Sequence, residues 1–330
     1  MEKSLFTDSD ITNIKNAGYL LKKSNPVLSY KLLSLASKKT PNDASLRKSL
    51  VEIKELIGIT TFFVIGNCQA AVVSDILESK SNKLISYGSI AVHLFDHDES
   101  IFDILDDVDF IITQNVGAYY KGINTENLLS LYPEKVIRIH NLHFEGYHPD
   151  WCYIPKVNGV RLQSPLGDYH NLTVLESYID KLPPEQAFER FMDVEYNKFR
   201  YGGAAEKSLN SLRVREKNVD IKMKDVIKSG FDNGEVLFHT FNHPTKKLLD
   251  TQVQKLMTFL NIDHNIQYGD GEVLNNLVMR TNPYFRSSFA IRDTIRKGTP
   301  VNMHKFIQES YDIYDNNQCF IDEFRDKVMV

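Results

Sequence analysis

A cysteine, two side-chain amides and a glycine stand together in the tetrapeptide Gly66-Asn67-Cys68-Gln69, directly after the apolar run 61–65. A glycine at the end of a strand permits a tight turn that a Cβ would obstruct. If a helix begins here, its first backbone N–H groups favour negative charge, which predicts a lowered pKa and a nucleophilic role for Cys68. The same N–H groups, with Asn67 and Gln69, would stabilise an oxyanion or bind a cofactor phosphate. A buried cysteine that only packs is the alternative.

A histidine lies in a second turn, Thr240-Phe241-Asn242-His243-Pro244-Thr245, between an expected strand and an expected helix. We expect this turn at the same sheet edge as Cys68. An imidazole with an ordinary pKa of about 6.5 suits a general base, and Asn242 would orient it or bind a substrate or cofactor. A histidine that merely caps the following helix is the alternative.

Two further amides, Gln114 and Asn115, end another expected strand. Side-chain amides at that position would donate hydrogen bonds to a developing oxyanion or to a cofactor. A plain turn explains them nearly as well.

Two loops are rich in polar and aromatic residues, 140–150 and 164–171. They resemble sugar-binding loops, in which rings stack on the sugar and carboxylates bind its hydroxyls. The candidate substrate-binding residues are His148, Asp150, Asp168 and His170. Their spacing matches no zinc pattern, so we expect no metal.

The elements that would position these residues follow from a change in hydrophobic period. Runs at 61–65, 89–95, 108–113 and 135–139 read as strands and alternate with helical segments, which predicts a doubly wound parallel sheet of Rossmann-like layers. In such sheets ligands bind outside the carboxyl ends of the strands. A short strand is expected at 235–240, followed by a helix at 245–260. Beyond about residue 150 the chain is loop-rich and then mostly helical, with one helix expected from Pro183-Pro184 to Phe199.

Residues 1–58 are predicted to be helical and to precede an α/β domain at 59–330. Their pattern weakly resembles one tetratricopeptide repeat, and one such repeat cannot bury its apolar face alone. We therefore expect a helical hairpin packed on the main domain. Binding of a protein partner by this hairpin is the alternative.

The chain has 330 residues and a formal net charge of -4, which argues against a dedicated nucleic-acid binder. No signal peptide and no membrane-spanning run is recognised, so we expect a cytoplasmic protein without membrane insertion. The three cysteines are scattered, which predicts neither a disulfide framework nor a structural zinc site.

Four motifs in order resemble the WcbI-type polysaccharide-biosynthesis proteins over roughly residues 62–260. They are Gly66-Asn67-Cys68-Gln69, Gly146-Tyr147-His148-Pro149-Asp150, the segment 164–170, and Phe241-Asn242-His243-Pro244. The resemblance implies an acetyltransferase that binds coenzyme A and modifies capsular sugars.

A looser likeness connects the chain with the SGNH hydrolases. Their nucleophile turn would correspond to Gly66-Asn67-Cys68, and their oxyanion asparagine to Asn115. Cysteine replaces the serine, and Thr240 stands where the orienting aspartate belongs, so a full Ser-His-Asp triad is absent.

Together with these features, the resemblance to the WcbI-type proteins implies an O-acetyltransferase that uses acetyl-coenzyme A and a carbohydrate or nucleotide-sugar acceptor. His243 would deprotonate the acceptor or Cys68, and Cys68 would either carry the acetyl group or line the thioester pocket. Cations for the coenzyme A phosphates would come from Lys246, Lys247, Arg213 and Arg215. A carbohydrate esterase and a non-catalytic glycan- or nucleotide-binding module are the rivals.

Overall fold

The computed structural model describes residues 7–37, 39–40, 43–96, 99–263, 271–291 and 301–328. The chain divides into two compact units. The first comprises residues 1–139 and 253–267, and the second comprises 140–252 and 268–330. Within the described residues, no helix combines the length and the apolar character that a bilayer crossing requires. The predicted domain boundary near residue 58 stays a prediction.

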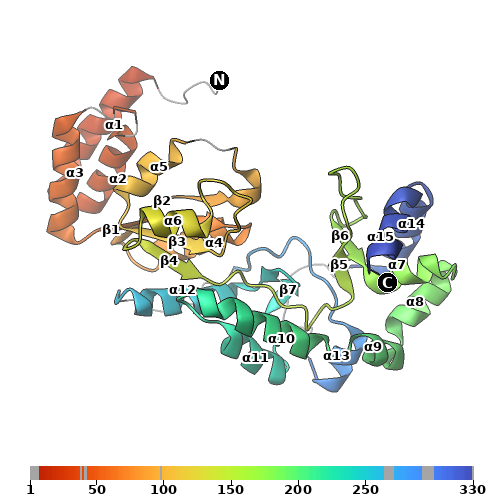
Figure 1. The fold of residues 1–330 in the computed structure, drawn as a ribbon. Coiled ribbons are helices and arrows are strands. Elements are labelled where there is room, and N and C mark those ends of the chain that lie inside the picture. The colour runs from red at the N-terminus through yellow and green to blue at the C-terminus, as the bar shows by residue number, and fades with distance from the viewer. Residues whose placement is uncertain are drawn as a thin grey trace. The chain divides into compact units, whose positions relative to one another are not determined.

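A four-stranded parallel sheet forms the centre of the first unit (Figure 1), with the strand order β2-β1-β3-β4. The strands are β1 (Thr60–Gly66), β2 (Leu84–Ala91), β3 (Phe110–Gln114) and β4 (Val136–Ile139). All residues of β1 after Thr60 are buried, as a continuous β-branched and aromatic run predicts for a central strand. The second strand begins at Leu84, earlier than expected, and the expected strand residues 92–94 form a 3-10 turn instead.

Helices alternate with the strands of this sheet along the chain. They are α4 (Gln69–Ser79) after β1, α5 (Ile101–Asp107) before β3 and α6 (Thr125–Leu131) before β4. Apolar residues of β1, β3, α5 and α6 share one buried cluster, which includes Ile65, Leu105, Ile111 and Leu128. The mixed α/β class is thus confirmed, and the doubly wound, SGNH-like arrangement stays a prediction.

The N-terminal segment is helical, as predicted, and it forms three helices; its description as a hairpin is not confirmed. They are α1 (Asp8–Leu21), α2 (Pro26–Ser37) and α3 (Ala44–Ile57). A Cβ on Gly18 of α1 would lie 2.7 Å from Leu33 of α2, so the glycine permits a close approach of the two helices. Their buried face shares a cluster with Ile85 of β2, and the hydroxyls of Tyr30 and Tyr87 are 3.1 Å apart. The third helix contributes its buried residues Leu46 and Ile53 to the same cluster.

The second unit is mostly helical. Its helices are α7 (Leu172–Ile179), α8 (Pro184–Met192), α9 (Val194–Tyr201), α10 (Ala204–Arg215), α11 (Lys224–Asp232), α12 (Lys246–Phe259, counted with the first unit from Val253), α13 (Pro283–Ser288), α14 (Met303–Asp315) and α15 (Gln318–Val328). Two short antiparallel pairs accompany them: β5 (Trp151–Tyr153) with β6 (Tyr169–Asn171), and β7 (Phe238–Thr240) with β8 (His243–Pro244).

Two expectations for this unit are corrected. The single helix expected up to Phe199 is divided, because Asp193 leaves the helical conformation and its carboxylate accepts the N–H groups of Glu195 and Tyr196 to begin α9. The late strand is shorter than 235–240 and pairs with β8, which contains His243 itself. Its turn is therefore a hairpin and not the carboxyl end of a strand in the parallel sheet.

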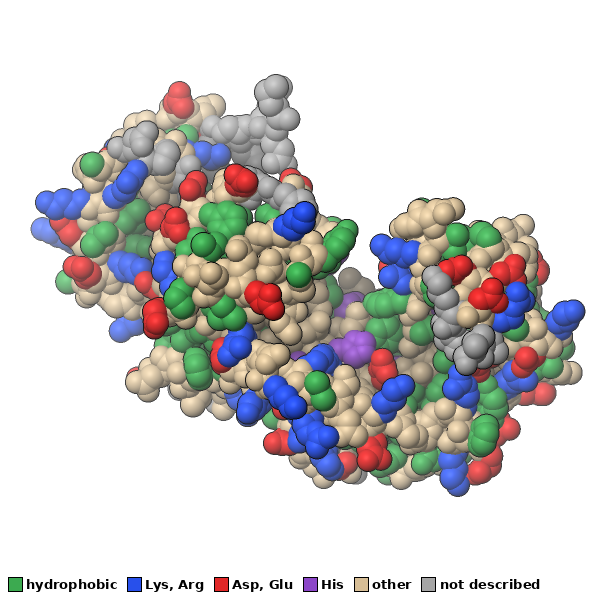
Figure 2. Space-filling view, viewed as in Figure 1, with side chains coloured by type: hydrophobic (Ala, Val, Ile, Leu, Met, Phe, Trp, Pro, Cys, Tyr) green, Lys and Arg blue, Asp and Glu red, His purple; other side chains and the backbone are tan. Residues whose placement is uncertain are grey.

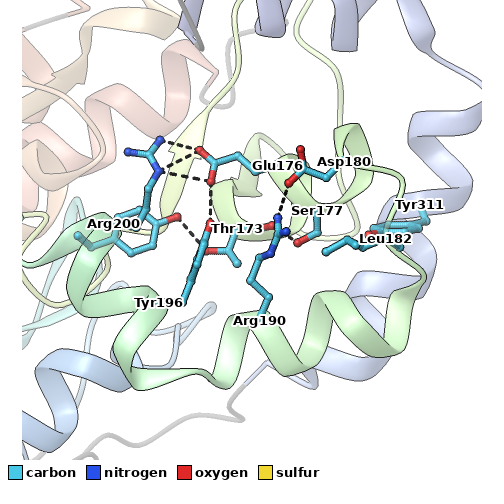
Figure 3. A network of polar contacts seen from close by, with 10 residues as sticks. Thr173, Glu176, Ser177, Asp180, Leu182, Arg190, Tyr196, Arg200 and Tyr311 are labelled. Atoms are coloured by element: carbon cyan, nitrogen blue, oxygen red, sulfur yellow. Dashed lines mark hydrogen bonds and ion pairs between the residues drawn. The ribbon is translucent and has the colours of Figure 1, made fainter.

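Polar contacts join α7, α8 and α9 (Figure 3). The Glu176 carboxylate of α7 is 2.6 Å from Arg200 Nη2 and accepts the Tyr196 hydroxyl at 2.9 Å, both partners being on α9. One helical turn later, Asp180 accepts a 2.6 Å bond from Arg190 of α8. Glu176 is buried, so these charge-assisted bonds compensate for the loss of its hydration.

Candidate functional site

The turn between β1 and α4 is held by side-chain amides. Gln114, at the end of β3, accepts a 2.9 Å hydrogen bond from the backbone N–H of Asn67. Its Nε2 donates a 3.0 Å bond to Oε1 of Gln69. The Asn67 Oδ1 in turn accepts the backbone N–H of Gln69 at 2.9 Å. Three polar side chains predicted to act in catalysis or cofactor binding thus form one connected network.

Gly66 makes room for this network. A Cβ at residue 66 would lie 2.7 Å from Oε1 and 2.8 Å from Cδ of Gln114, distances that a real Cβ does not tolerate. The glycine is therefore required by the amide beside it. This is a more specific reason than the general need for a tight turn.

Cys68 is the residue that this turn presents. It lies at the N-cap position of α4, its thiol is free and the residue is half-buried. Burial raises the pKa of the Cys68 thiol above its ordinary value, and a hydrogen bond with its own backbone N–H offsets this only in part. The expected lowering of its pKa by the helix N-terminus is therefore wrong in direction, because desolvation outweighs the favourable N–H groups.

The expected supply of free amide hydrogens at this turn is also reduced. The N–H groups of Asn67 and Gln69 are taken up by side-chain oxygens within the protein. Gln69 and Gln114 are buried, at 0% and 2% exposure, so neither side chain reaches solvent for the predicted contact with a cofactor or an oxyanion. Their geometry favours a role in holding the turn.

Asn115 is the exposed amide at the carboxyl end of β3. The next residue, Val116, is buried, and its backbone N–H donates to Thr125 Oγ1 at 2.8 Å. The same hydroxyl donates to the Gln114 carbonyl at 3.1 Å. The strand end that carries Asn115 is thus anchored on both sides while its side chain faces solvent.

His243 belongs to the second unit, where it begins β8. Its backbone N–H donates to Thr240 Oγ1 at 3.1 Å. Burial, followed by the charge of His239, lowers the pKa of the imidazole below its ordinary value, and a hydrogen bond to the backbone of Leu274 offsets part of that effect. The imidazole is therefore neutral at pH 7 and able to accept a proton. Cys68 and His243 thus belong to different units of the structure.

Asn242, predicted to orient the imidazole or bind the cofactor, is engaged by hydroxyl groups. Its Oδ1 accepts bonds of 2.8 Å from Tyr169 and from Thr240, and its Nδ2 donates to the Tyr153 hydroxyl at 2.9 Å. The Tyr169 ring meets the His243 ring edge-on, with 6.3 Å between centroids. Asn242 therefore joins the β7–β8 hairpin to a pair of tyrosines that the sequence did not single out.

The cations predicted for the coenzyme A phosphates are mostly committed within the protein. Lys246 pairs with buried Asp250, and Lys247 pairs with Glu235. Arg215 donates to the carbonyls of residues 141 and 143. Arg213 is exposed on α10, and Figure 2 shows Lys and Arg side chains gathered over the region of α10 and α11.

Three of the four predicted substrate-binding residues are fully buried: His148, Asp150 and His170. Each ring nitrogen of His170 lies 3.0 Å from a protein oxygen, one on Tyr314 and one on Leu162. This favours a structural role for His170 over the predicted contact with a sugar.

The fourth, Asp168, is partly exposed and forms an ion pair of 3.3 Å with Arg161. Arg161 also lies over the Tyr153 ring, 5.0 Å from its centroid.

Asp150 accepts a 2.9 Å bond from Asn171. Burial raises the pKa of Asp150 to about 6, although bonds to Asn171 and Asn282 act in the opposite direction. No group of three or more His, Cys, Asp or Glu side chains in the described part of the chain is arranged to hold a metal ion.

Among the described residues of the second unit, two grooves are candidate ligand sites. One of about 440 Å³ runs between α11 and α12 and is lined by Asp225, Ser229, Glu235, Lys247 and Thr251, among others. Another of about 360 Å³ is lined by Phe188, Met192, Arg280 and His304, among others. Neither includes a residue of the predicted site except Lys247.

Comparisons with known proteins bear on this site. A family model described as "Polysaccharide biosynthesis enzyme WcbI" matches residues 61–265, which span β1 to α12. A solved structure described as WcbI, "a novel polysaccharide biosynthesis enzyme", has a TM-score of 0.69 at 16% identity and covers 82% of this chain and 96% of its own. Its description adds that the native protein lacks a disulfide bond between coenzyme A and a cysteine. At that identity the likeness establishes the fold alone. No curated protein matches the sequence.

Proposed function

The chain belongs to the WcbI family of polysaccharide biosynthesis enzymes, and from that premise we propose that it transfers an acetyl group from acetyl-coenzyme A to a sugar hydroxyl. The acceptor would be a capsular or surface-polysaccharide precursor. The observation that carries the proposal is the half-buried, free thiol of Cys68 at the carboxyl end of β1.

The strand order supports a ligand at this position. From β1 the sheet continues to β2 on one side and to β3 on the other. In parallel sheets, ligands bind outside the carboxyl ends of the strands where the order reverses in this way. The carboxyl ends of β1 and β3 are adjacent, because Gln114 of β3 bonds the residue that follows β1.

The relative of known structure supports coenzyme A as the ligand. Its description names a disulfide between coenzyme A and a cysteine, as a bond that the native protein in that structure lacks. Such a bond requires a cysteine beside the sulfur end of the cofactor. We assign the equivalent position in this chain to Cys68, because burial of the thiol raises the pKa of Cys152 to about 12 and Cys319 lies exposed on α15.

In the proposed reaction the acceptor hydroxyl oxygen attacks the thioester carbonyl. A C–O bond forms, the C–S bond breaks, and coenzyme A leaves as a thiolate, which takes up the proton that the base has removed from the hydroxyl. The raised pKa of Cys68 keeps its sulfur mainly protonated at pH 7. This favours direct transfer, with Cys68 lining the thioester site, over an acetyl-cysteine intermediate.

Two residues complete the proposal. His243, neutral at pH 7, is the base for the acceptor hydroxyl. Asn115, exposed at the end of β3, is the donor to the oxyanion, because Gln69 is buried and already bonded.

Calorimetric titration with coenzyme A and acetyl-coenzyme A tests the donor, and thiol release from acetyl-coenzyme A in the presence of nucleotide sugars tests the transfer. We expect binding of both cofactor forms and a release of thiol that depends on an acceptor. Hydrolysis of an aryl acetate or an acetylated sugar, without any binding of coenzyme A, would point to an esterase instead. An acetyl group found on Cys68 by mass spectrometry would overturn direct transfer.

A further inference from the structure

We propose that Gln114 is a positioning residue that fixes the turn bearing Cys68, and thereby the surroundings of its thiol. Only the effect of Gln114 on the acetyl transfer rests on the proposed function. The clamp itself is a property of the first unit: Gln114 of β3 reaches across to the residues that follow β1. It acts through Cys68 and touches no substrate.

The orientation of the Gln114 amide is fixed by chemistry. A backbone N–H can only donate, so the atom that faces Asn67 N, 2.9 Å away, is the side-chain oxygen. The amide nitrogen therefore faces Gln69, where it donates to Oε1 at 3.0 Å. The same reasoning applies to Asn67, whose Oδ1 faces the Gln69 N–H. The backbone N–H groups of Asn67 and Gln69 thus determine which way the side-chain amides of Gln114, Gln69 and Asn67 are oriented.

The support for Gln114 is itself rigid. Its backbone lies in β3, in register with Ile139 of β4. Its carbonyl accepts hydroxyl bonds from Thr113 at 2.7 Å and from Thr125 at 3.1 Å. A residue held in this way transmits the position of the sheet to the turn.

Glutamine meets both requirements of this position, an acceptor for Asn67 N–H and a donor for Gln69. Glutamate would keep the acceptor for Asn67 N–H and lose the donor for Gln69. Asparagine is one methylene shorter, and methionine offers neither group. The absence of a Cβ at Gly66 is the matching feature, because the Gln114 amide occupies that space.

The clamp predicts a measurable effect on the thiol. Burial is the main reason that the pKa of the Cys68 thiol lies above its ordinary value. If Gln114 no longer bonds the turn, water reaches the sulfur more easily and that effect diminishes. The midpoint of Cys68 reactivity against pH should therefore move down, toward the ordinary thiol value of about 8.5.

The test is the rate of iodoacetamide alkylation of Cys68 at a series of pH values, followed on its own peptide by mass spectrometry. We expect the midpoint in Gln114→Ala to fall by about half a pH unit or more. The matched control is Gln254→Ala, on the part of α12 that belongs to the first unit, where the midpoint should equal that of the wild type. Gln114→Met, which keeps the length of the side chain, serves if the alanine variant fails to fold and should shift in the same direction.

An unchanged midpoint in a folded Gln114 variant, or an equal shift in Gln254→Ala, would overturn the positioning role. Because alkylation needs no coenzyme A, that failure is distinct from a failure of the proposed function. A protein that shows the shift but binds no coenzyme A in calorimetry would keep the clamp and lose the acetyltransferase.

Discussion

The amide oxygen of Gln114 occupies the space in which Gly66 would otherwise carry a Cβ, 2.7 Å from the position of that atom. The two residues end neighbouring parallel strands, and each makes the other's conformation possible. This relationship fixes the turn that begins α4, and with it the position of Cys68, the thiol that we assign to the cofactor site. The predictions below follow from this turn and from the charges of the second unit.

Gly66→Ala should destabilise the protein by about 1–3 kcal/mol, because the new methyl group collides with the Gln114 amide. Urea unfolding with an unchanged m-value measures the loss. Gly117→Ala is the matched control, since a Cβ at residue 117 meets nothing within 4 Å. In the double variant Gly66→Ala, Gln114→Ala the collision is absent. The stability losses of the two single variants should therefore add up to more than the loss measured for the double variant. Strict additivity would contradict the account.

Asp150 should make stability depend on pH in an unusual direction. Its pKa in the folded protein is about 6, above its value of about 3.8 in the unfolded chain, so the folded state binds more protons between these two pH values. The contribution of this group to stability is therefore fully present below about pH 4 and is lost as the pH rises through about 6. Relative to the wild type, Asp150→Asn should be more stable at pH 8 than at pH 4, by up to about 3 kcal/mol. A difference that does not vary with pH would contradict the assignment.

Glu176 and Asp180 offer a matched pair of charge removals on α7. Glu176→Gln disturbs a buried carboxylate bonded by Arg200 and Tyr196, and should cost about 1–3 kcal/mol, reduced from the value for a fully buried pair because Arg200 is 40% exposed. Asp180→Asn breaks a more exposed pair with Arg190 and should cost less than about 1 kcal/mol. Chemical denaturation of both variants checks the order, and equal losses would contradict it.

His243→Gln should lower acceptor-dependent release of coenzyme A by about 100-fold or more, with little change in the affinity for coenzyme A. His304→Gln, in a ring stacked 3.6 Å from Phe188, is the matched control and should retain the wild-type rate. Because the pKa of His243 is lowered, the rate should fall with decreasing pH only below the ordinary value of about 6.5. A loss of cofactor affinity equal to the loss in rate would argue against a base.

The sequence was sufficient to predict elements whose signal is local. The run 61–65 is β-branched and aromatic, and it lies in the buried strand β1. This strand ends at the turn that contains Asn67, Cys68 and Gln69. The sequence could not show which amide bonds which. Gln114 was expected to contact a cofactor, and its actual partners are 45 and 47 residues away in the chain.

The sequence also could not show which polar residues are buried. The loop residues Asp150 and His170 look like ligands for a sugar, yet they are enclosed beside the apolar cluster that includes Trp151 and Tyr314. The strand partner of β7 also depends on a two-residue segment, β8, too short for any periodic signal. Such outcomes depend on packing between segments distant in sequence, which composition and period do not encode.

The most direct test of the central claim is to locate the cysteine that reacts with oxidised coenzyme A. In this exchange the Cys68 thiolate attacks one sulfur of the cofactor disulfide, the S–S bond breaks, and one coenzyme A leaves as a thiolate. At pH 8.5 and equimolar reagent, peptide mass spectrometry should find coenzyme A on Cys68 before Cys319, although Cys319 is more exposed. Acetyl-coenzyme A should slow the reaction, and oxidised glutathione should show no preference for Cys68. Modification confined to Cys319, or a rate at Cys68 that acetyl-coenzyme A leaves unchanged, would contradict a coenzyme A site at this turn.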